Sequence, residues 1–297
     1  MKKTKYHNNN KHKGGVIINN DIVKYHNDLN GISTKNWTAE DINFFFAVIS
    51  KIRDKGCEEI VISTEEIKEL IDYSDRNFRW VKILENIADK IMGLRYIEKT
   101  NDEIAYFNMF QRFKINIKNK DISIKVTSDF EYIVNKLTAN FTTYELAEFT
   151  SLKSVYSKTM YRILKQWRTT GKKEFSLDKL KKVLEVPKTY TNGMINKRII
   201  PQIKKELSQF FDNLKIKTVK ENTRGNPITG YIFTWTPEQT STWDPNKYNY
   251  KKPKRKPKIK SKDNYNADGK SYAEIARERR NKRTLELMAK EKGETDV

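Results

Sequence analysis

The chain has 297 residues and carries 59 Lys and Arg against 38 Asp and Glu, a net charge of +21. This length suggests two domains, and an aromatic content of 11% excludes a wholly disordered chain. The longest apolar run, Phe44–Ile49, is far shorter than the ~20 residues of a membrane helix. No apolar stretch follows the basic N-terminus, so we expect a cytoplasmic protein without a secretory signal or a membrane partner.

Most catalytic and metal chemistry is also excluded by composition. Cys57 is the single cysteine, and the three histidines all lie near the N-terminus, at positions 7, 12 and 26. A cysteine cluster, a paired-histidine metal site and a P-loop are therefore absent from the sequence. A rolling-circle nickase with a tyrosine nucleophile would need paired histidines to hold its metal. We expect no enzyme activity, no cofactor and no metal.

The positive charge is concentrated in the second half of the chain. Residues 38–131 carry a net charge of −3, residues 132–170 carry +4, residues 171–236 carry +8 and residues 245–297 carry +9. A general lysine bias would not leave the first half acidic. Clustered Lys and Arg with an isoelectric point near 9.7 are typical of a nucleic-acid-binding protein.

The first block of elements follows a disordered segment, residues 1–24. Thr38 and Asp41 form a capping box at the start of a helix over 38–53. Thr64 is expected to cap a second helix and Gly93, in a left-handed conformation, to end a third. The predicted order is helix 38–53, strand 59–63, helix 65–71, helix 75–92, strands 94–99, 104–110, 113–117 and 122–126, and helix 129–137.

The second block begins with a short helix that Thr143 caps and that ends at Phe149. A longer helix follows and ends at Gly171. The remaining order is strand 174–177, helix 178–185, helix 193–211, and strands 214–220 and 231–235 around an exposed tip. Residues 237–297 are predicted to form a basic linker and a tail helix over 272–290, because Ser271 and Glu274 form a capping box.

The two blocks repeat one pattern of helix, strand, helix, turn, helix and hairpin. Ser63 aligns with Ser176 at an offset of 113, and Trp80 aligns with Ile200 at an offset of 120. Helix-turn-helix with a hairpin is the winged-helix arrangement. We therefore predict an α+β fold of two tandem winged-helix domains, a pseudo-repeat over 25–137 and 138–236, between disordered basic tails.

Several segments within residues 25–236 carry a resemblance to a known family. They are Tyr25–Asn30, Phe44–Phe46, Tyr156–Trp167, Asn196–Pro201 with Lys204–Leu207, and Gly230–Phe233. In these segments the chain resembles the initiator replication proteins of iteron-type plasmids. The resemblance implies non-enzymatic binding to direct repeats in double-stranded origin DNA, origin opening by monomers and self-repression by dimers. It also implies contact with host replication proteins, an initiator and a helicase. The alternative is a winged-helix transcription regulator, which uses the same binding chemistry.

Three elements of the second domain are predicted to touch DNA. The helix over 193–211 has an apolar face for docking and long donors opposite it, as a recognition helix requires. The helix over 152–168 carries a basic stripe without acids, which suits phosphates. Solvated surface is the alternative for both. The predicted contacts are Asn196, Lys197, Arg198, Lys204 and Lys205, then Lys158, Arg162, Lys165 and Arg168, and in the hairpin Lys220, Arg224 and Asn226.

The first domain is predicted to contribute differently. On the helix over 75–92, Glu85 and Asp89 would repel phosphates, while Arg76, Arg79 and Lys82 could contact the DNA backbone. We expect auxiliary DNA contacts and a main role in self-association. Phe78 and the strands between 94 and 126 are the candidate contact surface, with ordinary packing as the alternative for Phe78.

Overall fold

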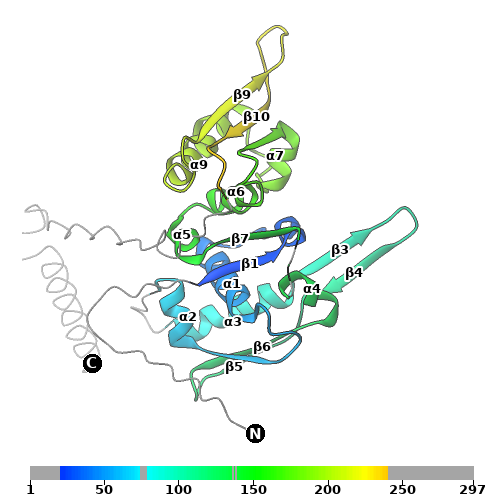
Figure 1. Ribbon diagram of the computed structural model, residues 1–297, viewed down its shortest axis with the longest axis vertical. Helices are drawn as coiled ribbons and strands as arrows, with labels where there is room; N and C mark the ends of the chain where they lie inside the picture. The colour runs from blue at the N-terminus through cyan, green and yellow to red at the C-terminus, as the bar shows by residue number, and fades with distance from the viewer. Residues whose placement is uncertain (1–20, 74–78, 136, 138, 240–297) are drawn as a thin grey trace, which may run out of the picture. The chain divides into compact units, whose positions relative to one another are not determined.

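The structure is a computed structural model that describes residues 21–73, 79–135, 137 and 139–239. Two winged-helix units follow one another along the chain (Figure 1), so the predicted α+β fold is confirmed. The predicted tail helix and most of both tails lie outside the described residues. The predicted disorder of residues 1–24 is wrong at its end, because Ile22–Lys24 belong to strand β1 (Ile22–His26).

The first domain is built around an aromatic helix. Helix α1 (Ala39–Ile52) begins at the predicted capping box, in which Thr38 and Asp41 bond reciprocally. Phe44, Phe45 and Phe46 are all fully buried. Three consecutive residues point in different directions around a helix, so their burial means that α1 is covered on all sides. Helix α1 is therefore the centre of this domain.

Two helices and a three-stranded sheet pack around α1. They are β2 (Ile60–Ser63), α2 (Thr64–Leu70), α3 (Trp80–Met92), β5 (Phe110–Asn116) and β6 (Asp121–Val126), with sheet order β2-β6-β5. Ser63 rather than Thr64 caps α2. Gly93 ends α3 with a φ of −80°, so the predicted left-handed conformation is wrong. The predicted helix over 129–137 is a 3-10 turn, η2 (Ser128–Phe130), and a short α4 (Glu131–Val134).

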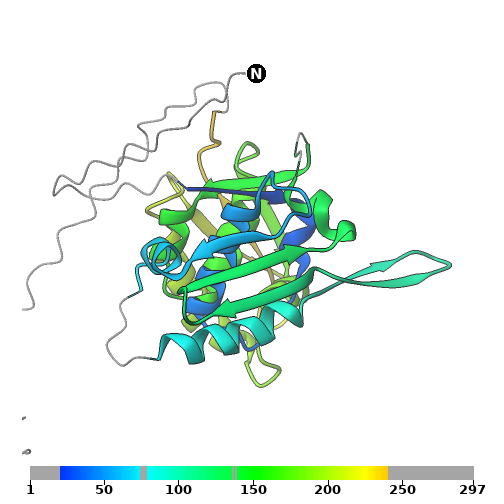
Figure 2. The same cartoon turned by 90° about the horizontal axis from the view of Figure 1, so that it is seen from below.

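A separate two-stranded arm is inserted between α3 and the sheet. Among the residues that the structure describes, strands β3 (Arg95–Lys99) and β4 (Ile104–Asn108) pair only with each other. They extend away from the sheet (Figure 2). In the second domain a hairpin pairs with strand β8 (Lys172–Ser176) in the way that the hairpin β5–β6 pairs with β2 in the first domain. The offset of 120 between the two blocks pairs Leu94 with Leu214, and so equates the strand after Leu94 with the first strand of that hairpin. The structure shows that β5–β6 are its counterpart and that the arm, residues 95–108, is an insertion.

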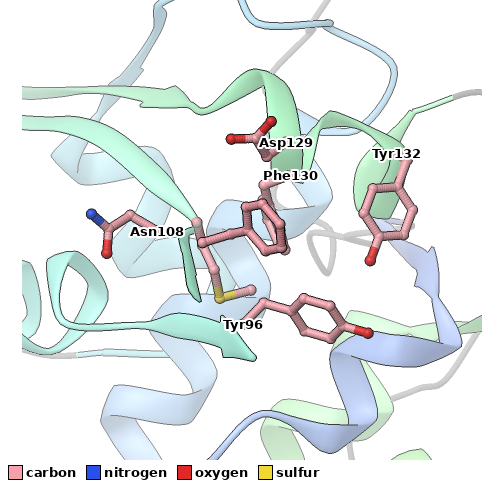
Figure 3. Close-up of a pocket in the computed structure, with 7 residues that line it drawn as sticks. Tyr96, Asn108, Asp129, Phe130 and Tyr132 are labelled. Atoms are coloured by element: carbon pink, nitrogen blue, oxygen red, sulfur yellow. The ribbon is translucent and has the colours of Figure 1, made fainter. Parts of the chain in front are cut away.

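The root of the arm is fixed to α4. Tyr96 of the arm and Tyr132 of α4 turn their hydroxyl groups toward one another beside Phe130 (Figure 3). The Tyr132 hydroxyl also donates to Asp28 at 3.2 Å. Burial and the Asp28 carboxylate raise the pKa of Tyr132. The cavity here is only about 10 Å³, room for one water, so these contacts hold the arm rather than a ligand.

The segment after residue 139 joins the start of the chain. Strand β7 (Phe141–Glu145) pairs antiparallel with β1, with Tyr25 opposite Thr142. The prediction that Thr143 caps a helix is therefore wrong, and helix α5 begins later (Leu146–Ser151). The first strand of the predicted first domain thus shares a sheet with the first strand of the predicted second domain. The boundary between residues 137 and 138 stays a prediction.

The second domain repeats the winged-helix order. Its elements are α6 (Val155–Gln166), β8 (Lys172–Ser176), α7 (Leu177–Val183), α8 (Asn192–Met194), the π-helical turn η3 (Ile195–Ile199), α9 (Ile200–Leu207), β9 (Lys215–Lys220) and β10 (Ile228–Thr234). Gly171, between α6 and β8, has a φ of +68°, and a Cβ there would lie 2.7 Å from the Trp235 carbonyl oxygen and from Pro237. This glycine lets the chain that leaves β10 pack against the end of α6.

Helix α6 lies between the two domains, and its basic stripe is buried. It contacts α9 on one side and α1, β7 and η1 (Asn27–Gly31) on the other. Lys158, Arg162 and Lys165 are 0%, 1% and 4% exposed. The prediction that these three side chains face DNA phosphates is wrong for this arrangement, because both long sides of the helix are covered by protein.

Each buried cation of α6 has partners from distant parts of the chain. Lys158 Nζ donates to Asn43 Oδ1 at 2.6 Å and to the Phe149 carbonyl oxygen at 2.7 Å. The Arg162 guanidinium lies 4.8 Å from the centre of the Phe46 ring, a cation–π contact. Burial lowers the pKa of Lys158 to about 7. These side chains attach α6 to α1 of the first domain and to the end of α5.

Lys165 is at the centre of a buried ionic cluster. Its Nζ lies 2.7 Å from Glu238 Oε1 and 3.6 Å from Glu148 Oε2, and the Tyr161 hydroxyl donates to the same Glu148 oxygen. Glu145 is buried nearby, and burial with the neighbouring Glu148 charge raises its pKa to about 7. Lys165 therefore has carboxylates on two sides. Ionisation of Glu145 in the folded protein is unfavourable, because the side chain is buried beside another negative charge.

We predict that Arg162→Ala destabilises the fold and leaves DNA salt dependence unchanged. Losing a fully buried long side chain should lower the free energy of unfolding by about 2–4 kcal/mol. The slope of log affinity against log salt should stay constant, since no phosphate contact is lost. Urea denaturation and DNA titrations at several salt concentrations measure both quantities. A salt slope reduced by about one would show that Arg162 contacts a DNA phosphate.

We predict that Glu145→Gln stabilises the protein at neutral and higher pH. The pKa of Glu145 is about 7 in the folded protein and near 4.5 in the unfolded chain. As the pH rises through this interval, the unfolded chain ionises first, so the free energy of unfolding of the wild type falls. The variant should gain about 1–3 kcal/mol at pH 8 and nothing at pH 4.5. Denaturation across this range tests the profile.

Glu148→Gln is the matched control for this experiment, because it removes a carboxylate that contacts Lys165. Its expected effect at pH 8 has the opposite sign. Equal effects of the two substitutions would contradict the assignment of the titration to Glu145.

Candidate nucleic-acid interface

The helix predicted to read DNA has the two faces that the sequence indicated. We call residues 192–207, which comprise α8, η3 and α9, the basic helix. Its apolar side chains are buried in the second domain, whereas its long polar side chains are exposed. The buried residues are Ile195, Ile199, Ile200, Ile203 and Leu207, and the exposed ones are Asn196, Lys197, Arg198, Lys204 and Lys205. Five donors thus share the outer side of one helix.

Pro201 distorts this helix. Proline has no N–H, so the Lys197 carbonyl oxygen loses its α-helical donor. The turn before it is π-helical, with the Ile200 N–H bonded to the Ile195 carbonyl oxygen. A π turn accommodates one extra residue and often occurs at functional sites. Lys197 and Arg198 lie within this turn, and Lys204 and Lys205 lie in the regular helix after it.

The hairpin β9–β10, residues 215–234, is the second wing and flanks the basic helix. Lys220, Arg224 and Asn226 are exposed near its tip, where Gly225 and Asn226 both have positive φ. The Tyr231 hydroxyl donates to Asn196 Oδ1 at 3.4 Å, which joins the wing to the basic helix. Lys215 and Lys217 on β9 are also exposed, and they are not among the DNA contacts predicted from the sequence.

The fourth residue of the predicted α6 stripe, Arg168, is half-buried. Its Nη1 donates to the Thr143 carbonyl oxygen at 3.4 Å, and its Nε lies 4.0 Å from Glu238. With Lys158, Arg162 and Lys165 buried, α6 presents no basic stripe beside the basic helix. The basic helix and the second wing carry exposed long donors instead, and further exposed lysines lie on β8, on α7 and in the turn that follows, at Lys172, Lys179, Lys182 and Lys188.

On the first domain, α3 carries charges of both signs. Arg79, Lys82, Glu85 and Asp89 are exposed, as the mixed face predicted, and Arg76 and Phe78 lie outside the described residues. The hairpin β5–β6, residues 110–126, is the first wing and holds five basic residues against one acidic residue. The five are Arg112, Lys114, Lys118, Lys120 and Lys125.

The total charge of the first domain conceals this first wing. The net charge of −3 over residues 38–131 is the sum of an acidic helical part and a basic hairpin. A count over each hairpin would have separated them, because residues 110–126 alone carry +4. Four of the five basic side chains are exposed, and Lys125 is half-buried. Basic wings thus occur on both domains.

Other kinds of site find little support in the described part of the chain. No cluster of three or more His, Cys, Asp or Glu residues there could hold a metal ion. Among the same residues, no helix is long and apolar enough to cross a membrane. A hollow of about 510 Å³ in the first domain is lined by His26, Glu131, Tyr132 and Asn135 among others, and none of these belongs to a basic wing or to the basic helix.

Comparisons with known proteins agree with this architecture. Residues 22–165 match the family described as "Initiator Replication protein, WH1", and residues 176–235 match "Initiator Rep protein, WH2". The probable replication protein rep of Bifidobacterium longum (strain NCC 2705) is 28% identical over 226 residues, 74% of each chain.

A solved structure shares the fold. The crystal structure of Pi initiator protein in complex with iteron DNA superimposes with a TM-score of 0.58 at 13% identity, over 74% of this chain and 98% of that chain. This likeness supports the tandem winged-helix fold. Both family regions occur here in order, and together they span nearly all of the described residues. The chain therefore belongs to the initiator replication protein family.

Proposed function

We propose that this protein initiates plasmid replication by binding direct repeats in double-stranded origin DNA and nucleating strand opening. In this proposal it acts without catalysing a covalent step, and as a dimer it represses its own promoter. Host replication proteins, an initiator and a helicase, are its expected partners. The similar Pi initiator, whose crystal structure contains iteron DNA, supports the choice of repeats as the ligand.

The basic helix is the observation that carries the proposal. Asn196, Lys197 and Arg198 are exposed on the first half of a helix whose opposite face is buried. Side chains there suit base edges in a major groove, since recognition helices meet bases near their N-terminal end. Lys204, Lys205, Lys220 and Arg224 suit the phosphates on either side. The net charge of +8 over residues 171–236 supports a steep salt dependence.

The first domain has a second role in this proposal. Its basic wing, with Arg79 and Lys82, supplies auxiliary phosphate contacts, and its arm supports self-association. Within the described residues, both edges of the arm lack a strand partner, and Ile97, Ile104 and Tyr106 are 46%, 55% and 64% exposed. Unpaired edges with apolar side chains are sites of pairing between chains. The tail residues 245–262, with nine basic and no acidic side chains, are proposed to add affinity without specificity.

A winged-helix transcription regulator remains the second candidate, because the same surface would bind a promoter operator. Footprinting on the DNA beside the gene separates the two. Protected direct repeats spaced by about two helical turns support initiation. A single protected palindrome at a promoter, without repeats, contradicts it and favours regulation.

We predict that Arg198 reads a base and that Arg224 anchors a phosphate. Arg198→Ala should cost about 1–3 kcal/mol on the cognate repeat and relax specificity at one base position. Arg224→Ala should weaken cognate and random DNA alike and lower the salt slope by about one. Equilibrium titrations on both DNAs at several salt concentrations distinguish the two roles. Equal losses for Arg198→Ala on both DNAs would show that it does not read sequence.

We predict that Tyr106→Glu weakens self-association. A charge on the exposed face of the arm should raise the dimer dissociation constant by about tenfold or more. Ile117→Glu is the matched control, because Ile117 is equally exposed, at 67%, but lies outside the arm. Sedimentation velocity over a range of concentrations gives both constants. The arm is excluded as the dimer contact if the two variants behave alike.

A further inference from the structure

One acidic side chain connects the basic helix to the rest of the molecule. Glu206 lies on α9 among lysines, and its Oε2 accepts hydrogen bonds from the backbone N–H groups of Lys153 and Ser154, both at 3.2 Å. Its Oε1 accepts from Gln202 one turn earlier. Ser154 is the N-cap of α6. The carboxylate therefore holds the backbone at the point where α6 begins.

This contact continues the attachment of α6 to the first domain. Lys158 and Arg162 fix α6 against Asn43, Phe149 and Phe46. Glu206 then fixes α9 to the start of α6. A charge-assisted bond to two successive backbone amides leaves less freedom than a contact between two flexible side chains. The direction of the basic helix is thus tied to the first domain through α6.

We propose that Glu206 is a positioning residue that sets the angle of the basic helix relative to α6, and so determines how well this protein discriminates its cognate DNA. The proposal rests on the proposed function, in which the basic helix reads base edges. Base contacts require an accurately placed helix, whereas long lysines can follow a phosphate through a small tilt. A loosened helix should therefore lose discrimination before it loses general affinity.

The sign of the charge makes the proposal testable. An acidic residue on a DNA-binding helix repels phosphate, so its removal by itself predicts tighter binding to any DNA. Glu174 provides a matched control, because it is an exposed acid on β8 whose Oε1 lies 2.7 Å from the Nζ of Lys172. Glu206→Ala and Glu174→Ala each remove one negative charge from the same domain. Only a positioning role predicts that the first weakens cognate binding.

The experiment titrates the full chain and its variants on cognate and random DNA. Glu206→Ala should weaken cognate binding by about tenfold or more, with random DNA bound equally or more tightly. Glu206→Gln, which keeps an acceptor, should recover most of the loss. Glu206→Asp keeps the charge but is one methylene shorter, so it should resemble Glu206→Ala. Hydrogen exchange of the Lys153 and Ser154 amides should rise in the Ala and Asp variants alone.

The outcomes separate this proposal from the proposed function. If Arg198→Ala reduces discrimination while Glu206→Ala and Glu206→Asp behave like Glu174→Ala, the positioning role is wrong and the basic helix still reads DNA. If neither Arg198→Ala nor Glu206→Ala affects discrimination, the proposed reading surface is itself wrong. If Glu206→Ala fails to fold, the Asp and Gln variants decide, and equal discrimination by these two overturns the proposal.

Discussion

The burial of α6 between two domains is the constraint on which the remaining structure depends. A helix with cations at three successive turns can be enclosed only if polar partners enter the enclosure with it. Asn43 and the Phe149 carbonyl oxygen meet that need for Lys158, and Glu148 and Glu238 meet it for Lys165. Arg162 instead lies over the Phe46 ring, and its Nε and Nη1 have no hydrogen-bond partner among the described residues. The partners of the two lysines come from both sides of α6 in the sequence, so the helix ties together segments that a simple chain of two domains would leave apart.

This arrangement explains why the ends of the domains are interleaved. Strand β7 leads into α5 and α6, yet it pairs with β1 at the start of the described chain. The segment after β10 returns to α6, where the Glu238 N–H bonds to the Arg168 carbonyl oxygen. The first family region accordingly runs through residue 165 and includes α6. The second wing and the basic helix are thereby held on a base that belongs partly to the first domain.

Local rules predicted much of the fold, and long-range contacts account for most of the errors. The Thr38–Asp41 capping box and the buried face of the basic helix each depend on neighbouring residues. The α6 stripe was wrong because periodicity separates two faces but does not say what covers the second one. Its nearest acids in space, Glu148 and Glu238, lie outside the basic stretch. Similarly, threonine is a common helix N-cap, but Thr143 pairs with Lys24 of β1 and therefore lies in a strand.

The π-helical turn changes the direction in which side chains after it project, relative to side chains within it. In a regular α-helix each residue advances by about 100°, so the directions of Lys197, Arg198, Lys204 and Lys205 would be fixed by their spacing alone. The extra residue in the turn Ile195–Ile199 changes that relation. Deleting one residue from the turn would rotate one pair of side chains against the other, although Pro201 would still lack the N–H of a regular helix. A chain with the same four side chains but without the extra residue would therefore present them in a different geometry.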